Sequence, residues 1–303
     1  MKRESFGSRL GFILVSAGCA IGIGNVWKFP YICGAYGGAA FILIYLCFLV
    51  ILGIPVLVAE FAVGRGSHTS VAKCFDKLAP AGSGWKPLKF IGIIGCYMLM
   101  MFYTTVGGWM IYYCVKSLRG DFVGATPEAV TQSFSDMLGN APTMMLWMVI
   151  ICLIGFAVCF MGLQNGIEKI SKVMMSALLI IMVILAVHSV MMEGAGEGIS
   201  FYLIPDFQKI KEAGVGNVVF AALSQSFFTL SIGIGAMLIF GSYLDKSRSL
   251  TGEAVSITVL DTFVALTAGF IIIPACFSYG IQPDAGPSLI FITCLLYTSD
   301  AAD

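Results

Sequence analysis

The sequence predicts an all-α polytopic membrane protein, and three observations carry this prediction. Hydrophobic residues make up 58% of the 303 residues and charged residues 11%, and the mean hydropathy of +0.94 is far above that of a soluble domain. Apolar stretches of about 20 residues, the length that crosses a bilayer, recur along the chain. Two of these stretches are interrupted by glycines in their middle. We therefore expect a bundle of membrane-spanning helices, two of which are broken.

Seven apolar stretches are predicted to span the membrane. They cover residues 10–31, 39–63, 88–115, 143–162, 170–192, 215–243 and 254–279. Between them we expect loops at 65–87, 117–142 and 193–214 and a tight turn at 164–169.

Basic residues indicate that the N-terminus lies in the cytoplasm, because lysine and arginine gather in loops on that side. With this orientation, the basic residues left outside are Lys116, Arg119, Lys209 and Lys211. The first span has no convincing cleavage site, so we expect no cleaved signal peptide. The formal net charge of zero argues against a nucleic-acid partner.

Ten cysteines suggest a disulfide framework only until they are placed along the chain. Most lie in or beside predicted spans, where free cysteine packs as a small apolar residue. No cluster of cysteine and histidine has the spacing of a metal site. We expect neither a disulfide nor a zinc site.

Residues 18–30 (GCAIGIGNVWKFP) form the most informative segment. Gly18, Gly22 and Gly24 cluster inside a span, and because glycine is a poor helix former, they predict unwinding within the membrane. Unwound backbone must be buried in protein or line a cavity, since lipid offers it no hydrogen bonds. Free carbonyls, free amides and the side chain of Asn25 suit a small ion and a small polar solute. The segment therefore predicts a transport site.

The sixth predicted span carries a second interruption, at Ser231, Gly233 and Gly235. Two glycine-interrupted spans near corresponding points of two halves are typical of an inverted-repeat transporter. Close helix packing is the alternative for either segment alone, because glycines let helices approach one another. Both segments together, with Asn25 and Thr229 beside them, favour a site.

Several motifs in this order resemble the neurotransmitter:sodium symporter family, in its bacterial amino-acid transporter branch. They are RLGFILVSAGCAIGIGNVWKFPY at 9–31, GIPVLVAEFAVGR at 53–65, SFFTLSIGIGAM at 226–237, LDTFVALTAG at 260–269 and GPSLIFIT at 286–293. The resemblance covers about residues 3–293 and is most specific in the first and sixth spans. It implies sodium-coupled symport of an amino acid by alternating access in a bacterial inner membrane, through two inverted five-helix repeats.

The resemblance also implies two Na+ sites beside the broken spans. At positions that match the family motifs, the first ion would be held by Ala20, Asn25, Thr229 and Asp261, and the second by Gly18 and Ile21. Sodium is a hard cation that prefers oxygen ligands, which unwound carbonyls supply without added charge. No organic cofactor is implied.

By the same resemblance, a substrate carboxylate would lie on the amides of residues 22–24, at the positive end of a half-helix. The implied substrate positions are Ala20, Gly22, Ile23, Gly24, Leu99, Tyr103, Phe228, Thr229, Ser231 and Ile234. Amine transporters of the family carry aspartate where this chain has Gly22, so glycine indicates an amino acid that brings its own carboxylate. Ile234 replaces a larger phenylalanine of a leucine-transporting bacterial member, which favours a hydrophobic or aromatic substrate.

Asp261 departs from that leucine-transporting member, which has asparagine here and a glutamate four residues later, where this chain has Ala265. An acid in a span is costly unless it is paired or coordinates an ion. We therefore interpret Asp261 as both a sodium ligand and the fixed negative charge, and we expect chloride-independent transport. The alternative is a protonated carboxyl group that is hydrogen-bonded to neighbouring helices.

Four further residues match family positions of other roles. Glu60 resembles an acid that hydrogen-bonds the unwound backbone of the sixth span, although an interfacial carboxylate is an equal alternative. Lys28 takes the place of an outer-gate arginine. Arg3 and Tyr243 resemble members of the inner gate, and Arg3 is alternatively a positive anchor on the inner side.

Residues 1–192 are predicted to form the first five-helix repeat and residues 193–293 an incomplete second repeat. The last ten residues, 294–303, fit no family pattern, and we interpret them as an artefactual tail on a chain truncated after about seven spans. Family members have eleven or twelve spans, so we expect this chain by itself to be inactive. The sequence does not predict an oligomeric state.

Three other functional classes fit the sequence less well. A non-transporting amino-acid receptor of the same fold is the main alternative, since it would keep the same pocket. A channel needs a polar stripe through several spans, whereas the polar groups here concentrate at one level. An enzyme needs a nucleophile–base or metal constellation, and the sequence shows none.

Overall fold

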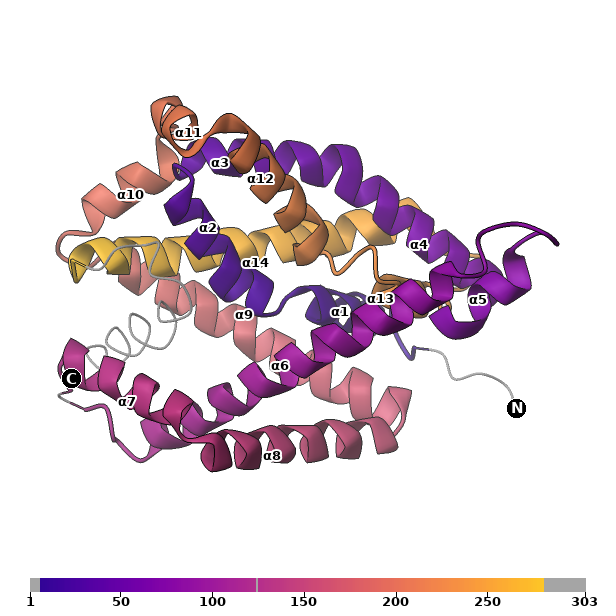
Figure 1. The fold of residues 1–303 in the computed structure, drawn as a ribbon, viewed down its shortest axis with the longest axis horizontal. Helices are drawn as coiled ribbons and strands as arrows, with labels where there is room; N and C mark the ends of the chain where they lie inside the picture. The colour runs from indigo at the N-terminus through magenta and orange to yellow at the C-terminus, as the bar shows by residue number, and fades with distance from the viewer. Residues whose placement is uncertain (1–5, 124, 281–303) are drawn as a thin grey trace.

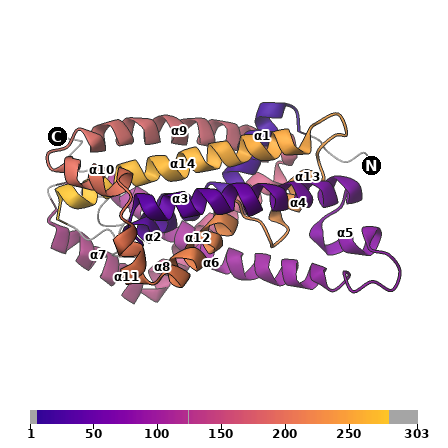
Figure 2. The ribbon, with the colours of Figure 1, turned by 90° about the horizontal axis from the view of Figure 1, so that it is seen from above.

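The computed structural model describes residues 6–123 and 125–280, which form an elongated bundle of helices (Figures 1 and 2). In chain order the helices are α1 (Arg9–Ala20), η1 (Gly24–Lys28), α2 (Phe29–Ala35), α3 (Ala39–Phe48), η2 (Leu49–Gly53), α4 (Ile54–Ser67), α5 (Val71–Leu78), α6 (Leu88–Leu118), α7 (Pro127–Gly139), α8 (Ala141–Phe160), η3 (Leu163–Glu168), α9 (Lys169–Val190), α10 (Ala195–Leu203), α11 (Phe207–Ala213), α12 (Val215–Thr229), α13 (Ala236–Gly241) and α14 (Leu250–Ser278). The η elements are π-helical turns. Arg3, the motif at 286–293 and the tail at 294–303 lie outside the described residues.

The predicted spans are present, and the first and sixth are broken as expected. Among the described residues, five helices are long and apolar enough to cross a membrane. The pair 9–20 and 24–35, which is the first predicted span, makes one more candidate and bends by 55°. The sixth predicted span consists of α12 and the short α13, separated by residues 230–235. The other spans are each continuous, and η2 joins α3 to α4 within one helix of 29 residues, Ala39–Ser67.

The predicted connections contain more helix than the sequence suggested. The expected turn at 164–169 is wrong: Gly162, with φ of 84°, makes the turn, and η3 then leads directly into α9. The expected loops contain α5, α7, α10 and α11. Two of these helices, α7 and α11, begin at capping side chains that a search for spans ignores. The Thr126 hydroxyl accepts from the Ala129 amide, and the Asp206 carboxylate accepts from the Gln208 amide.

The helices divide into a buried centre and an exposed pair. α14 runs through the centre and contacts α1, α4, α9 and α10, and its buried side chains include Ile257, Asp261 and Ala265. In contrast, α8 has no buried residue and packs mainly on α6, whose outer face carries exposed residues such as Met98 and Met101. The site described below is built around α14.

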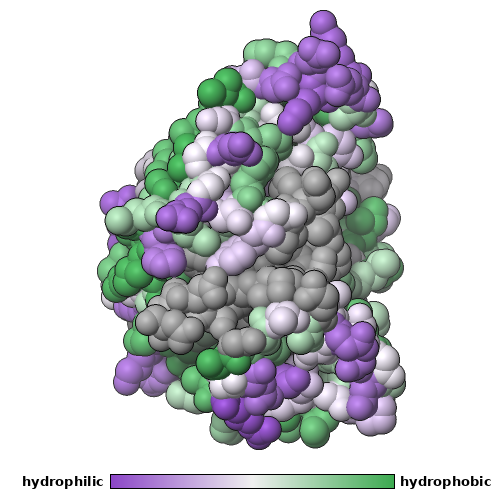
Figure 3. All heavy atoms as spheres, turned by 90° about the vertical axis from the view of Figure 1, so that its left-hand side faces the viewer, coloured by the Kyte–Doolittle hydropathy of each residue, from purple (hydrophilic) through white to green (hydrophobic). Residues whose placement is uncertain are grey.

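The two ends of the bundle carry the connections. α5 lies at the same end as the N-terminus, and α7 and α10 lie at the opposite end (Figures 1 and 2). Figure 3 shows this opposite end, where hydrophilic residues gather at the top, over the position of α11 in Figure 1. The side chains of Asp206, Lys209, Lys211 and Glu212 are exposed there. The loops assigned to opposite sides of the membrane thus lie at opposite ends.

Candidate ion and substrate site

Three predicted ion ligands meet at the centre of the molecule. Asn25 comes from η1, Thr229 from the last turn of α12 and Asp261 from α14. The Asn25 amide donates to Asp261 Oδ1 at 2.8 Å and to the Asp261 carbonyl at 3.0 Å, and the Thr229 hydroxyl donates to Asp261 Oδ2 at 2.8 Å. All three residues are fully buried. The fold therefore joins both broken spans to one carboxylate.

This buried cluster offers carboxylate oxygens in the protein interior. A carboxylate taken out of water is costly unless donors or a cation compensate its charge. Each oxygen of Asp261 accepts one donor and keeps further acceptor capacity. The Asn25 amide nitrogen faces this carboxylate, whereas the Asn25 oxygen accepts weakly from the Gly22 amide at 3.5 Å, on the side of the first break. Carboxylate and amide oxygens are ligands of the kind that a hard cation prefers.

The backbone break of the first span lies directly beside this cluster. α1 ends at Ala20, and Ile21 takes an extended conformation with φ of −71° and ψ of 101°. The chain becomes helical again when the amides of Asn25 and Val26 bond the Gly22 carbonyl at 3.1 and 3.2 Å. The structure thus confirms the unwinding expected from the glycine cluster.

The other predicted positions of the first span lie along this break and the helix before it. Ala20 is buried at the end of α1, and Gly18 faces Met175 of α9, whose sulfur would lie 3.3 Å from a Cβ added at Gly18. The second sodium site, assigned to Gly18 and Ile21, stays a prediction.

The break of the sixth span runs over residues 230–235 and uses left-handed backbone. Ser231, Gly233 and Gly235 have φ of 52°, 93° and 78°. Glu60 of α4 bonds the far side of this segment: its Oε1 accepts from the Gly233 amide at 2.6 Å and its Oε2 from the Leu238 amide at 3.2 Å. The hydrogen-bonding role of Glu60 is therefore confirmed over that of a purely interfacial carboxylate.

A side-chain bond also joins the two breaks directly. The Ser231 hydroxyl donates to the Cys19 carbonyl at 3.1 Å, at the end of α1. Gln225, one turn before the end of α12, donates to the Gly24 carbonyl at 3.1 Å and is fully buried. Sequence reasoning missed Gln225, although an amide in an apolar span is a signal of the same kind as Asn25.

A cavity of about 810 Å³ opens beside the two breaks. Five of the predicted substrate residues line it: Leu99, Tyr103, Phe228, Ser231 and Ile234. Lys28 also lines it, with its ammonium nitrogen 3.8 Å from the centre of the Phe228 ring. A cation at this distance is attracted by the face of the ring.

Gly22 and Gly24 each lie against a ring that lines the cavity. A Cβ added at Gly22 would lie 3.8 Å from the Tyr103 hydroxyl oxygen, so Gly22 and Tyr103 face one another. A Cβ added at Gly24 would lie 2.8 Å from the Phe228 ring, which is too close. Residues larger than glycine at position 24 would push the ring away.

Of the predicted gate residues, the structure describes Lys28 and Tyr243. Tyr243 follows α13, and its ring packs edge-on against the ring of Phe6, with centroids 5.7 Å apart. This contact lies beside α1, at the end of the bundle opposite α7. Arg3 lies outside the described residues, so its role stays a prediction.

Comparison with known proteins agrees with this geometry. The profile of the Sodium:neurotransmitter symporter family matches residues 3–132 and 128–282. An uncharacterized sodium-dependent transporter of Bacillus subtilis, YhdH, is 37% identical over 290 residues, which are 96% of this chain and 63% of that protein. The sodium-dependent serotonin transporter of Drosophila melanogaster is 28% identical over 340 residues, covering 96% of this chain and 52% of the transporter.

A solved structure has the same fold. The crystal structure of MhsT in complex with L-phenylalanine matches 98% of this chain and 67% of its own chain, with a TM-score of 0.91 and 37% sequence identity. This match confirms the predicted transporter fold. The chain spans between about half and two thirds of the length of the proteins named here.

Proposed function

Because this chain belongs to the Sodium:neurotransmitter symporter family, we propose that it serves sodium-coupled symport of an amino acid across a bacterial inner membrane. The observation that carries this proposal is the buried cluster of Asn25, Thr229 and Asp261, which joins both broken spans at one carboxylate. Sodium bound there would be a transported substrate, held by oxygens of both spans. A ligand shared by two movable segments couples their conformations.

The cavity supports an amino acid as the second substrate. Gly22 faces Tyr103, which lines the cavity, and the amides that begin the second half of the first span carry the positive end of its dipole. These groups suit a carboxylate. The rest of the lining is mainly apolar, with Leu99, Phe228 and Ile234, which suits a hydrophobic or aromatic side chain. The similar protein MhsT binds L-phenylalanine.

The charge of Asp261 supports transport without chloride. Asp261 is fully buried and lies one turn before Ala265, which is also buried and has no charge. A carboxylate fixed at this place compensates a sodium ion without a mobile anion. We expect uptake to persist when gluconate replaces chloride, and a fall to background in gluconate would contradict this part of the proposal.

The remaining assignments follow from the same family. The N-terminus is proposed to face the cytoplasm, and residues 1–192 and 193–293 are proposed to belong to two inverted repeats. Access to the site would then alternate between the two ends of the bundle. Lys28 would close the outer side and Arg3 with Tyr243 the inner side.

Because the chain by itself is expected to be inactive, uptake into proteoliposomes by the full-length protein tests the main proposal. Radiolabelled L-phenylalanine is offered under an inward sodium gradient, and accumulation is expected to disappear when potassium replaces sodium. Asn25→Ala should abolish it, whereas the matched substitution Asn217→Ala, at an exposed position of α12, should not. Equal uptake in sodium and potassium would contradict sodium-coupled symport. Sodium-dependent binding without accumulation would favour the receptor alternative.

A further inference from the structure

The inner half of the first span is the short helix α1, which has a backbone break at one end and contacts with two acidic side chains at the other. α1 covers Arg9–Ala20 and ends at the break of residues 21–23, where the span bends by 55°. Its other end carries the N-terminal residues and is held by two acidic side chains from different elements. These are Glu253, in the first turn of α14, and Glu168, at the end of η3.

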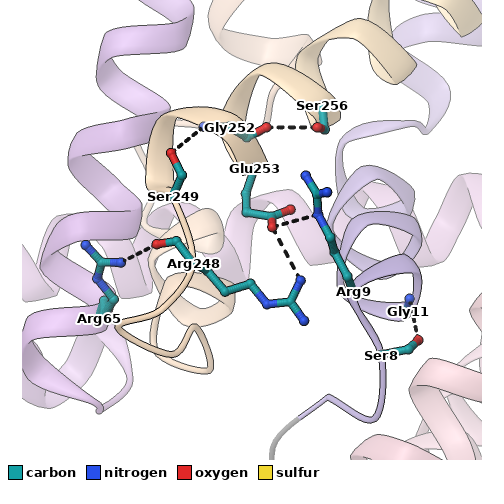
Figure 4. Close-up of polar contacts among 9 residues, drawn as sticks. All are labelled: Ser8, Arg9, Gly11, Arg65, Arg248, Ser249, Gly252, Glu253 and Ser256. Carbon is teal, nitrogen blue, oxygen red and sulfur yellow. Dashed lines mark hydrogen bonds and ion pairs between the residues drawn. The ribbon is translucent and has the colours of Figure 1, made fainter.

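Glu253 joins α1 to two other parts of the inner end (Figure 4). Its Oε1 lies 3.0 Å from Arg9 Nε and 3.5 Å from Arg248 Nη1, and the Arg248 carbonyl accepts from Arg65 of α4 at 2.9 Å. The Glu253 side chain is 3% exposed, whereas that of Arg9 is 58% exposed. The acid is therefore fixed in the protein interior, and the arginine of α1 reaches it from the surface.

Glu168 holds the same end of α1 from the opposite side. Its Oε2 accepts from the Gly7 amide at 2.8 Å, and its Oε1 accepts from the Ser8 hydroxyl at 3.2 Å and from Lys172 at 2.7 Å. Gly11 permits this approach, because a Cβ there would overlap the carboxylate. Ser8 also caps α1 by accepting from the Gly11 amide at 2.9 Å. The Glu168 side chain is only 4% exposed.

We propose that Glu168 and Glu253 are positioning residues that form an inner latch, which holds α1 against α9 and α14 and releases it as a unit about the break. Both acids are buried, so a released α1 would leave two carboxylates without their partners from that helix, at a cost in free energy. Because both acids hold the same end of α1, its release would break both sets of contacts. The latch rests on the proposed function, because it would set which end of the bundle opens to the site.

The latch has a consequence that a merely structural contact lacks. If loosening it populates a state in which α1 leaves its neighbours, the sodium ligands next to the break separate in that state. Apparent sodium affinity then falls by the fraction of molecules still closed, while the number of sites is unchanged. A contact that only stabilises the whole fold would instead lower the melting temperature and leave the sodium affinity of the folded protein unaltered.

Hydrogen exchange with mass spectrometry on the protein in lipid nanodiscs tests the latch directly. In Glu253→Gln and Glu168→Gln, amides of residues 7–20 are expected to exchange about tenfold faster, while those of α2 and α8 stay as in the wild type. Glu193→Gln, at an exposed position, is the matched control and should change nothing. In parallel, the apparent sodium dissociation constant from thermal shift should rise about threefold to tenfold in the latch variants.

A milder variant keeps the test decisive if a carboxylate variant does not fold. Arg9→Gln removes the exposed partner and should loosen residues 7–20 alone, whereas Arg9→Lys, which keeps the charge, should restore most of the protection. Exchange as slow as in the wild type in all latch variants would overturn the proposal. So would faster exchange spread over the whole chain in every latch variant, Arg9→Gln included. Faster exchange confined to α1, together with no effect of sodium on the melting temperature of the wild type or of any variant, would support the latch. That result would count only against the proposed sodium symport.

Discussion

The break of the first span lies against the buried side chains of Asn25 and Asp261, whereas the break of the sixth span is bonded from one side by Glu60. The first break covers residues 21–23 and contains no left-handed residue, so the helix is interrupted only briefly. The second covers residues 230–235 and needs positive φ at Ser231 and two glycines.

The difference teaches how each break is stabilised. In the first span, the side chain of Asn25 bonds both the local backbone and Asp261 of the proposed ion site, so stability and sodium binding would depend on the same atoms. In the sixth span, the backbone amides are bonded by Glu60, which contacts none of the ion ligands in the bonds observed. We therefore expect substitutions at the first break to change sodium binding and those at Glu60 to change stability.

The largest effect is expected for Asp261→Ala. It removes the carboxylate that accepts from both Asn25 and Thr229, and it leaves Asn25 only its bond to the backbone carbonyl of residue 261. Sodium should no longer raise the melting temperature, and sodium-dependent uptake should fall at least about 100-fold, which corresponds to roughly 3 kcal/mol. Asp261→Asn, which keeps the shape and loses the charge, should retain part of the sodium response. If sodium still raised the melting temperature of Asp261→Ala as it does for the wild type, the cluster would not be the sodium site.

The next effect is expected for Glu60→Ala, which acts on the sixth span. It removes two charge-assisted bonds to backbone amides, each worth about 1.5–3 kcal/mol, and the unwound segment should lose stability by roughly 3 kcal/mol. Thermal unfolding in detergent measures this, with the exposed Glu212→Ala as control. The sodium dissociation constant of the folded fraction should stay within about twofold of the wild type. A larger change would show that the two breaks are not separable.

A smaller effect is expected for Gly24→Ala, where η1 touches α12. The added Cβ would lie 2.8 Å from the Phe228 ring, so the ring and the Lys28 ammonium above it must shift. Binding of L-phenylalanine should weaken about tenfold, since displaced binding groups act mainly through position. Gly216→Ala, with open space around its Cβ, is the matched control and should bind normally. Unchanged binding in Gly24→Ala would place the substrate away from Phe228.

The smallest effect is expected for Ser231→Gly. This change removes the hydroxyl bond to the Cys19 carbonyl but relieves the left-handed conformation of a residue with a Cβ, so the two terms oppose one another. The melting temperature should change by the equivalent of no more than about 1 kcal/mol. Ser231→Ala loses the bond and keeps the strain, so it should be the less stable of the two variants. The reverse order would mean that the hydroxyl bond contributes little.

Much of this arrangement was predictable from the sequence, because polar residues in apolar spans are conspicuous. The family resemblance implies one ion site for Asn25, Thr229 and Asp261, and the structure brings these three residues together. The glycines at 22 and 24 and at 233 and 235 located both breaks. These signals are local, since they require only the residue type and its depth in a span.

The parts that were not predicted depend on long-range contacts. Glu168 and Glu253 lie at the ends of spans, where an acid ordinarily meets water, and their burial follows only from contacts 161 and 244 residues away along the chain. The turn expected at 164–169 was misplaced, because the positive φ of Gly162 is a backbone choice that a hydrophobic pattern does not reveal. The helices α5 and α11 are too short for their apolar pattern to stand out in a search for spans.

α14 carries both Asp261 of the ion site and Glu253 of the inner end on one uninterrupted helix. They are eight positions apart, which corresponds to a rise of about 12 Å, and each residue adds a rotation of about 100° around the axis. Inserting or deleting one residue between these positions would therefore turn Asp261 away from Asn25 while Glu253 stayed opposite Arg9. The number of residues in this segment therefore fixes the directions of both acids relative to one another. Natural variants are expected to substitute residues here without changing their number.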